Sequence, residues 1–367
     1  MPFLFFRRNM SSSEILNTIK KENSRAAKRI GILAVIAFFS AFVCLCSGSS
    51  GLGVREFINV LSGNGTDAEK MILVGIRLPR VAAAVIAGAG LSVSGCIMQK
   101  VLSNPLASPS TLGVSNGAVF GANIAIILLG AGSVNGTVKA SLTVNNPYTI
   151  TACSFAAALS GVAIILLLSA KKRFSSETVV LCGVAVGSFF TAGTTLLQYF
   201  SADSQVSSAV FWSFGDLGRA SVRECVYMAA ATVTGIILAA VKARDIDLFE
   251  QGDETARSLG INVFGLRLAC LCAASLICAV CVSFLGIIGF VGLCAPHAAK
   301  RITGSKMSVL LPSAALCGMI ILPLSDAAAR SVIHGVSLPV GAVTSLFGGP
   351  IFLFLLLGKG GVRRAVD

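Results

Sequence analysis

The residues that could do chemistry in this chain are few, and the densest group is a charged run between two long apolar segments. The stretch 245–260, DIDLFEQGDETARSLG, holds five of the sixteen acidic residues: Asp245, Asp247, Glu250, Asp253 and Glu254. Asp253 and Glu254 are placed to begin a short helix, where the helix dipole favours anions, and Gly260 is placed to end it. Two interpretations are open: a surface that another protein binds, or a solvated linker.

Motifs for catalysis and nucleotide binding do not support an enzyme. The chain has no G-x-x-x-x-G-K-[ST] run to hold ATP phosphates. Residues 113–117, GVSNG, fit G-x-S-x-G, but no strand–turn–helix context or acid–histidine partner accompanies them. Cys278 and Cys281 form a C-x-x-C inside an apolar run without an accompanying His, which favours packing over metal binding. We therefore expect no catalytic residue, no metal site and no cofactor bound by this chain.

One ionisable pair lies inside an apolar segment. Asp326 is the only acid deep in such a segment, and Arg330 follows one helical turn later. An i, i+4 pair lowers the penalty of about 2.5–3.5 kcal/mol that each charge would carry alone near mid-membrane. The pattern predicts a structural ion pair between Asp326 and Arg330. An ion-coupled secondary transporter would need more intramembrane carboxylates or histidines, and an intramembrane enzyme would need a paired nucleophile and base.

Composition decides where these residues must sit. The chain has 367 residues, of which 55% are hydrophobic and 12% are charged, and its mean hydropathy is +0.85. Soluble domains carry about 25% charged residues, so the composition indicates a multi-pass protein of the cell membrane. The net charge of +13 is typical of cytoplasmic loops that follow the positive-inside rule, so we expect lipid and no nucleic acid around the chain.

Ten apolar segments approach the roughly 20 residues needed to cross a bilayer. Gly, Ala and Ser are frequent in them, and such small residues let helices approach closely. The sequence thus predicts an all-α membrane protein, a tightly packed bundle of about ten transmembrane helices. The ten segments are 30–47, 81–102, 111–130, 149–170, 178–200, 222–243, 264–285, 289–302, 309–333 and 340–357.

Ten spans place both termini on one side of the membrane. With both termini inside, most of the 29 Lys and Arg residues lie in cytoplasmic segments, which supports this orientation. The stretch 245–260 then lies in the cytoplasm, since lipid offers its polar groups no partners. We divide the chain into a basic cytoplasmic N-terminal segment, 1–29, a transmembrane domain, 30–357, and a short basic cytoplasmic tail, 358–367.

Five segments, in order along the chain, together resemble the permeases of type II ABC importers. This is the FecCD-type family, which imports iron-siderophores, haem and cobalamin. Gln251 stands where the family usually has Leu, and residues 1–29 have no counterpart that can be placed. The five segments are RLPR at 77–80, NPLASPSTLGVSNG at 104–117, QGDETARSLG at 251–260, IGFVGLCAPH at 288–297 and LPVGAVTSLFGGP at 338–350.

The resemblance implies two surfaces that bind other proteins. One is a cytoplasmic helix that docks in a groove of a separate ATPase subunit, formed by Gly252, Asp253, Glu254, Arg257, Leu259 and Gly260. The other is a set of outer-face arginines that meet carboxylates of a substrate-binding protein, Arg77, Arg80 and Arg330. For Arg77 and Arg80 the alternative is anchoring at the membrane surface, and for Arg330 it is the pair with Asp326.

The resemblance also implies a path between two permease subunits. This path would narrow at its cytoplasmic side near Ser175, Ser176 and Glu177. Asn116 either lines the path or is only a polar packing group.

As a member of this family the chain would be a transport subunit and not an enzyme. It is expected to translocate an iron-siderophore delivered by an extracytoplasmic binding protein, with haem or cobalamin as alternatives. ATP and Mg²⁺ would be bound by partner ATPase subunits. A second permease subunit, identical or paralogous, would complete the path.

Overall fold

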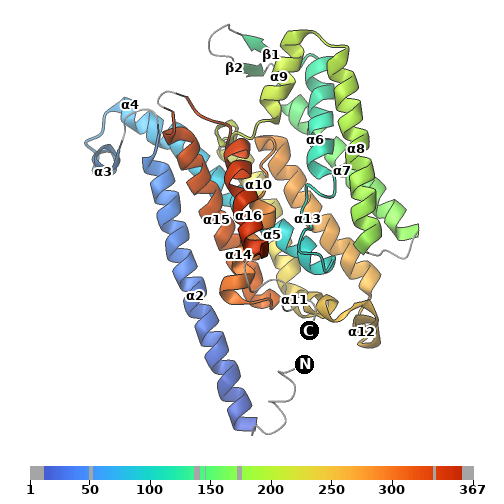
Figure 1. The fold of residues 1–367 in the computed structure, drawn as a ribbon. Helices are drawn as coiled ribbons and strands as arrows, with labels where there is room; N and C mark the ends of the chain where they lie inside the picture. Colours follow the sequence, from blue (N-terminus) through green and yellow to red (C-terminus); the bar gives the residue numbers. More distant parts are fainter. Residues whose placement is uncertain are drawn as a thin grey trace.

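The structure is a computed structural model that describes residues 12–48, 53–135, 141–144, 146–171, 176–333 and 336–357. Helices make up nearly all of the described part and run side by side as a bundle (Figure 1). This confirms the predicted fold class, an all-α membrane protein. The predicted tail 358–367 lies outside the described residues.

The first half of the chain starts with a long helix at one edge of the bundle and ends with helices at the opposite edge (Figure 1). Its elements are α2 (Ser12–Cys46), α3 (Val54–Leu61), α4 (Asp67–Lys70), the π-helical η2 (Met71–Arg77), α5 (Leu78–Val101), α6 (Val114–Asn123), the π-helical η3 (Ile124–Leu128), β1 (Gly132–Asn135), β2 (Ser141–Val144), α7 (Pro147–Lys171) and α8 (Ser176–Tyr199).

The second half supplies the remaining helices and the short connections between them. Its elements are α9 (Asp203–Ser213), the 3₁₀-helical η4 (Leu217–Arg219), α10 (Val222–Val241), α11 (Ala243–Asp247), the 3₁₀-helical η5 (Leu248–Gln251), α12 (Asp253–Ser258), α13 (Val263–Leu285), α14 (Val291–Thr303), α15 (Met307–Ser331) and α16 (Val340–Leu357).

A small hairpin is the departure from an all-helical fold within the described residues. Strands β1 and β2 pair antiparallel, with Gly132 opposite Val144 and Asn135 opposite Ser141. The β2 sequence, SLTV, alternates polar and apolar residues and contains two β-branched side chains, which suits a strand. This short strand pattern was overlooked beside the much longer apolar segments.

Each of the ten predicted spans coincides with a helix, although the helices differ in length. Seven helices of the described part are long and apolar enough to cross a membrane, and 114–128 and 340–354 form shorter apolar helices. The eighth predicted span corresponds to the 13 residues of α14. The second span begins earlier than expected, because its helical run starts at Asp67 and not at 81. Arg77 and Arg80 suggested a membrane boundary, but internal partners accommodate both.

Helix α5 forms the centre of the bundle. In the apolar stretch of the helical run that ends with α5, 83% of the residues are buried, compared with 22% in the apolar stretches of α2 and α8. Helix α5 packs against α10, α13, α14 and α15. Small residues make these contacts possible. A Cβ atom added at Gly95 would collide with the carbonyl oxygen of Gly292 on α14, and one added at Gly88 with that of Gly318 on α15.

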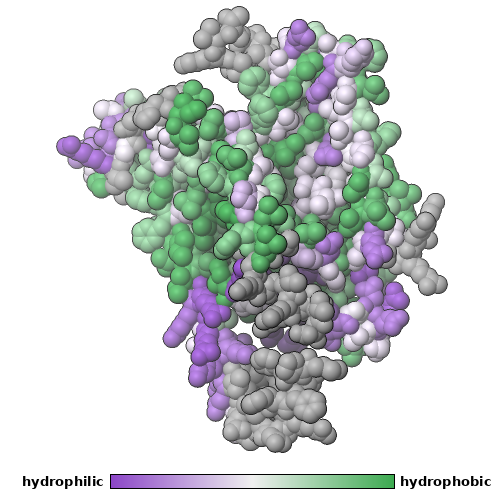
Figure 2. Space-filling view, viewed as in Figure 1, coloured by the Kyte–Doolittle hydropathy of each residue, from purple (hydrophilic) through white to green (hydrophobic). Residues whose placement is uncertain are grey.

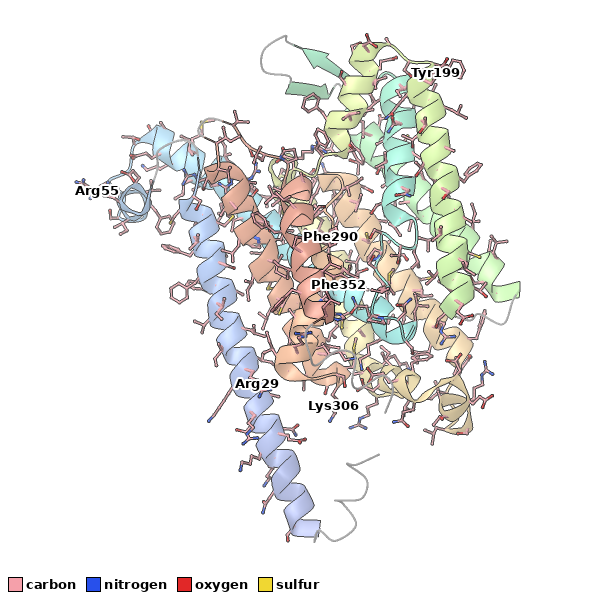
Figure 3. The ribbon with its side chains drawn as sticks, in the orientation of Figure 1. Arg29, Arg55, Tyr199, Phe290, Lys306 and Phe352 are labelled. Atoms are coloured by element: carbon pink, nitrogen blue, oxygen red, sulfur yellow. The ribbon has the colours of Figure 1, made fainter. Side chains whose placement is uncertain are left out.

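Helix α2 crosses the boundary that the sequence suggested between residues 29 and 30. Residues 12–29 are the first turns of α2 and continue without a break into the first span. Arg29 joins this helix to the bundle, because its Nη1 donates to the carbonyl oxygen of Ile302 at a distance of 2.6 Å. Figure 3 shows Arg29 and Lys306 toward one end of the molecule and Arg55 at the other.

The surface of the molecule is hydrophobic in the middle and more hydrophilic at its two ends. Figure 2 shows a broad hydrophobic band across the molecule, with hydrophilic residues gathered at the lower end, where α2 begins and α12 lies, and over α3 and α4 at the upper left. This distribution is expected for a protein that crosses a bilayer.

Candidate functional site

The polar stretch 245–260 folds mainly as three short helices, α11, η5 and α12, between α10 and α13. Two hydrogen bonds finish α12: Gly260 N–H donates to the Arg257 carbonyl at 2.9 Å, and Ile261 N–H donates to the Ala256 carbonyl at 3.1 Å. This is a Schellman ending, which requires the left-handed backbone that Gly260 adopts at φ +82°. Gly260 therefore ends the helix as its position in the sequence predicts.

Helix α12 and the residue after it expose both charged and apolar side chains to solvent. Glu254 and Arg257 are exposed, Leu259 just after the helix is 61% exposed, and Ala256 on the inner side is buried. The side chains predicted to bind in a groove of a partner are therefore accessible on α12, and the docking itself stays a prediction. Gly252, at φ +97°, turns the chain into this helix.

Asp253 faces the bundle and does not face solvent with its neighbours. Its carboxylate accepts two hydrogen bonds from Arg267, from Nη1 at 3.0 Å and from Nη2 at 2.7 Å. Arg267 is buried on α13, donates through Nε to the Val101 carbonyl at 3.2 Å and lies 5.1 Å above the Phe249 ring. Asp253 thus ties α12 to α13 and to the end of α5.

A second contact holds the start of the stretch. Lys100, buried at the end of α5, lies 3.1 Å from Asp247 and 2.9 Å from Glu250. Asp247 also accepts a hydrogen bond from the Met307 backbone N–H at 2.8 Å, at the first residue of α15. The stretch is therefore not a free linker: ion pairs and backbone bonds fasten it to α5, α13 and α15.

Asp326 is the centre of an ion cluster at the opposite end of the bundle. Its carboxylate is fully buried and lies 2.8 Å from Arg330 Nη2, which is the ion pair that the i, i+4 spacing predicts. Arg80 on α5 contributes a second guanidinium, with Nη2 at 2.9 Å and Nε at 3.0 Å from Asp326 Oδ1. Arg80 Nη1 also lies 3.2 Å from Asp216. The cluster joins α15 to α5 and to the loop before η4.

Arg77 and Arg330 fasten the end of α2 through hydrogen bonds to its backbone carbonyls. Arg77 Nη1 donates to the Leu45 carbonyl at 3.0 Å and to the Cys46 carbonyl at 3.3 Å. Arg330 donates to the Ser47 carbonyl at 2.6 Å and to the Cys44 carbonyl at 2.8 Å. Cations at the end of a helix satisfy carbonyls that have no intrahelical partner and favour its dipole.

The three arginines predicted to bind a partner protein therefore all have internal roles. Only 4% of Arg77 is exposed, and the side chains of Arg80 and Arg330 are 13% and 10% exposed. Docking through these residues stays a prediction, and each side chain would have to reach a partner from an occupied position.

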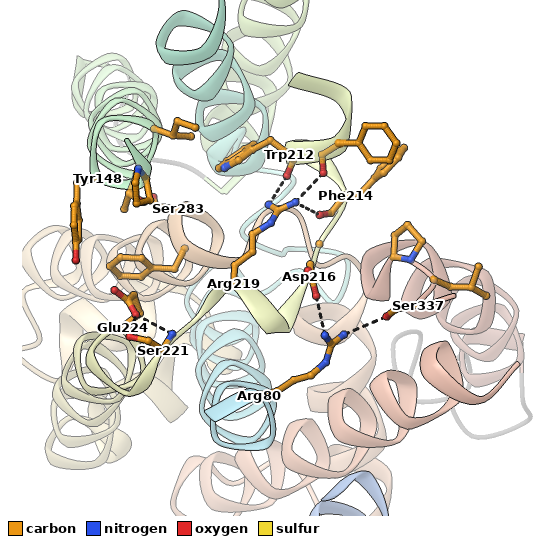
Figure 4. A pocket seen from close by; sticks show the side chains of 18 of the residues that line it. Arg80, Tyr148, Trp212, Phe214, Asp216, Arg219, Ser221, Glu224, Ser283 and Ser337 are labelled. Carbon is orange, nitrogen blue, oxygen red and sulfur yellow. Dashed lines mark hydrogen bonds and ion pairs between the residues drawn. The ribbon is translucent and has the colours of Figure 1, made fainter. Parts of the chain in front are cut away.

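A cavity of about 1030 Å³ lies beside Arg80 (Figure 4). Its walls carry aromatic side chains from α7, α9 and α13 and from the loop after α9: Tyr148, Phe211, Trp212, Phe214 and Phe284. Arg219 also lines it, and burial lowers the pKa of this guanidinium while nearby Asp216 partly opposes the change. Sequence reasoning named only Arg80 among these residues, although the run FWSF at 211–214, which holds the single Trp of the chain, was a signal.

The five sequence motifs, the helical bundle and the polar helix α12, which Asp253 fastens to α13, all point to one family. A model of the FecCD transport family matches residues 33–358. The chain belongs to the FecCD transport family. FecCD proteins are membrane permeases, so this chain is a multi-pass transport subunit and not an enzyme.

Several relatives of this FecCD chain are similar over most of their length. A Methanocaldococcus jannaschii protein, described as an ABC transporter permease, is 46% identical over 326 residues, which cover 89% of this chain and 93% of the relative. The Fe(3+)-citrate import system permease protein of Bacillus subtilis is 33% identical, with coverages of 91% and 97%. The hemin transport system permease protein of Yersinia pestis is also 33% identical, with the same coverages.

A solved structure supports the fold of the FecCD chain. It is described as an inward-facing conformation of a metal-chelate type ABC transporter, and it superposes with a TM-score of 0.76 at 24% sequence identity. The match covers 91% of this chain and 99% of the other. At this identity the likeness speaks for the fold alone.

The residues suggested for the path and its gate lie on α6 and at the start of α8 in the FecCD chain. Asn116 Nδ2 donates to the Gly187 carbonyl at 3.2 Å and to Thr191 Oγ1 at 3.3 Å, so it joins α6 to α8. Ser176 and the exposed Glu177 begin α8. Ser175 lies outside the described residues, and the gate stays a prediction.

Among the described residues, no group of three or more His, Cys, Asp or Glu side chains could hold a metal ion.

Proposed function

We propose that this chain is the permease subunit of a metal-chelate ABC importer, with an iron-siderophore as substrate and haem or cobalamin as alternatives. FecCD relatives named for Fe(3+)-citrate and hemin import support this substrate class. The observation that carries the ATP-driven function is α12. Its exposed residues are available to a partner, while Asp253 fastens it to α13, and Asp247 of the preceding α11 fastens the same polar stretch to α5 and α15.

In this proposal, a separate ATPase subunit binds the exposed side chains of Glu254, Arg257 and Leu259. ATP binding draws two ATPase subunits together and displaces α12. The ion pairs of Asp253 with Arg267 and of Asp247 with Lys100 pass this displacement to α13 and α5. Packed helices move as rigid bodies, so a small shift of α12 changes how the spans are arranged.

A second permease subunit, identical or paralogous, would cover faces that this chain leaves open. Helices α8 and α16 carry exposed large apolar side chains along much of their length. Examples are Phe189, Leu196 and Tyr199 on α8 and Leu346, Phe347 and Phe354 on α16. The substrate path would run between two such subunits.

An extracytoplasmic binding protein would deliver the chelate at the end of the bundle that holds Arg77, Arg80 and Arg330. In this region Arg80 and Arg330 share the carboxylate of Asp326, and Arg80 also pairs with Asp216. Docking at these arginines would take place through carboxylates on the partner's surface, and it should weaken as salt concentration rises.

The test is uptake of radioactive ferric siderophore by proteoliposomes that contain the permease, its ATPase and the binding protein. We expect uptake that depends on ATP and that stops when the phosphate-binding Lys of the ATPase is replaced. A secondary transporter would instead keep its uptake with the inactive ATPase. That result would overturn the proposed function.

A further inference from the structure

The cavity beside Arg80 is open to solvent at the end of the bundle opposite α12. Tyr148 in the first turn of α7 is 57% exposed and Phe214 after α9 is 41% exposed, and both line the cavity. With a volume of about 1030 Å³, the cavity lies just above the usual range of roughly 300–1000 Å³ for small-molecule sites. It has room for a metal chelate.

Aromatic rings form much of the cavity wall (Figure 4). Phe211 and Phe214 pack edge to face, with ring centroids 5.9 Å apart and an interplanar angle of 79°. Phe284 stacks on Tyr227 behind the wall, with centroids 6.2 Å apart and an angle of 14°. Rings that are held in place by other rings offer a flat ligand apolar surface at a small cost in side-chain entropy.

Arg219 supplies a positive charge to this wall. Its guanidinium donates to the backbone carbonyls of Trp212 at 2.7 Å, Phe211 at 2.8 Å and Phe214 at 3.1 Å. These three bonds use three of the five N–H groups of an arginine. Among the described residues, no carboxylate forms an ion pair with Arg219, so a ligand can supply the counter-charge.

The two carboxylates at the cavity are already engaged by the protein. Asp216 lies 3.2 Å from Arg80 Nη1 and accepts a hydrogen bond from the Gly218 N–H at 3.0 Å. Glu224 accepts from the Ser221 backbone N–H at 2.8 Å and from the Ser221 hydroxyl, as part of the capping box of α10. The positive charge of Arg219 therefore remains available to a ligand, and the negative charges do not.

We propose that this cavity is a substrate site that binds an anionic metal chelate carrying an aromatic ring system. The rings of the chelate would lie against Tyr148, Phe214 and Phe284, and an acidic group would bind the guanidinium of Arg219. This inference rests on the proposed transport function and names a substrate class for it. It excludes neutral chelates without rings as preferred substrates.

Trp212 gives a direct readout, because it lines the cavity and is the only Trp of the chain. The full-length permease in lipid nanodiscs is titrated with gallium tris-catecholate, which is anionic and aromatic. Gallium citrate, which is anionic without rings, and gallium desferrioxamine, which has neither feature, are the comparisons. We expect a saturable change in Trp212 fluorescence with half-saturation at a concentration at least about tenfold lower for the catecholate. Equal responses to the three chelates, or no response, would overturn the proposal.

Variants separate the aromatic wall from the charge. Phe214→Ala and Tyr148→Ala should each weaken catecholate binding by roughly two- to tenfold, and Arg219→Gln by about tenfold, with Arg219→Lys keeping part of the affinity. The control Phe38→Ala removes an exposed ring from α2, which does not line the cavity, and should change nothing. If Arg219→Gln fails to fold, the two aromatic variants still decide, because unchanged affinity in both refutes the site.

The two proposals can fail separately. ATP-driven uptake by the complete importer without a Trp212 response would reject the cavity and leave the transport function standing. Saturable binding at the cavity in an importer that never couples uptake to ATP would support the site and contradict the transport function.

Discussion

Replacing Asp326 by Asn should destabilise the permease strongly, because this buried carboxylate holds two guanidiniums at the outer end of the bundle. Arg80 and Arg330 each approach it to within 3 Å, at 2.9 Å and 2.8 Å, and none of its side chain is exposed. The Asn side chain has nearly the same shape but no charge. The substitution therefore removes the counter-charge and leaves the packing intact.

The remaining contacts set the expected size of the loss. Removing one partner of a buried ion pair costs about 3–5 kcal/mol. Arg80 keeps Asp216 at 3.2 Å, and Arg330 keeps its bonds to the Ser47 and Cys44 carbonyls. We therefore expect a loss near the lower limit, about 3 kcal/mol. For a chain of this size that corresponds to a fall of roughly 4 °C in the unfolding midpoint.

The assay is the fraction of purified permease that stays monodisperse on size-exclusion chromatography after heating. Asp67→Asn is a matched control, because the Asp67 side chain is fully exposed and its pair with Lys70, at 3.8 Å, is also exposed. We expect a shift of about 1 °C or less for this control. If Asp326→Asn lowered the midpoint no more than Asp67→Asn, the ion cluster would not be the structural element described here.

Three further predictions concern α12 and the centre of the bundle. Replacing Glu254 and Leu259 together by Ala should abolish co-purification of the ATPase without lowering the unfolding midpoint, since both side chains are exposed; unchanged co-purification would contradict the docking role. Arg267→Met should keep the ATPase bound but reduce ATP-driven uptake by at least about tenfold, because it removes the ion pair that fastens α12 to α13; normal uptake would show that force passes by another route. Gly95→Leu should prevent accumulation of folded permease in membranes, because its Cβ meets a backbone carbonyl of α14, whereas Gly31→Leu, with no atom within 4 Å of the new Cβ, should accumulate normally; equal levels of both would disprove the close packing.

Apolar segment length predicted the bundle well, because a bilayer imposes a strong and local constraint on each span. All ten predicted segments are helical, and the charges of residues 12–29 lie on the first turns of α2. The start of α5 was harder to predict. Arg77 and Arg80 resemble a membrane boundary until their partners on α2 and α15 are known, and those partners are far away in sequence.

The candidate sites show the same division between local and distant information. Gly260 could be recognised as a helix end from its own position, and the pair of Asp326 with Arg330 from its i, i+4 spacing. That Asp253 faces the bundle could not be recognised in this way, because its partner Arg267 belongs to the next span. The aromatic cavity is assembled from α7, α9 and α13, so no single stretch of sequence could reveal it.

The most direct test of the central claim, an ATP-driven importer of metal chelates, is ligand-stimulated ATP hydrolysis. The permease is reconstituted with its ATPase and binding protein, and hydrolysis is measured with ferric siderophores, haemin and cobalamin in turn. The account predicts that a chelate of one class stimulates hydrolysis and that the Glu254 and Leu259 double variant loses this stimulation. Failure of the permease to assemble with its ATPase, or hydrolysis in an assembled complex that responds to no chelate, would contradict it.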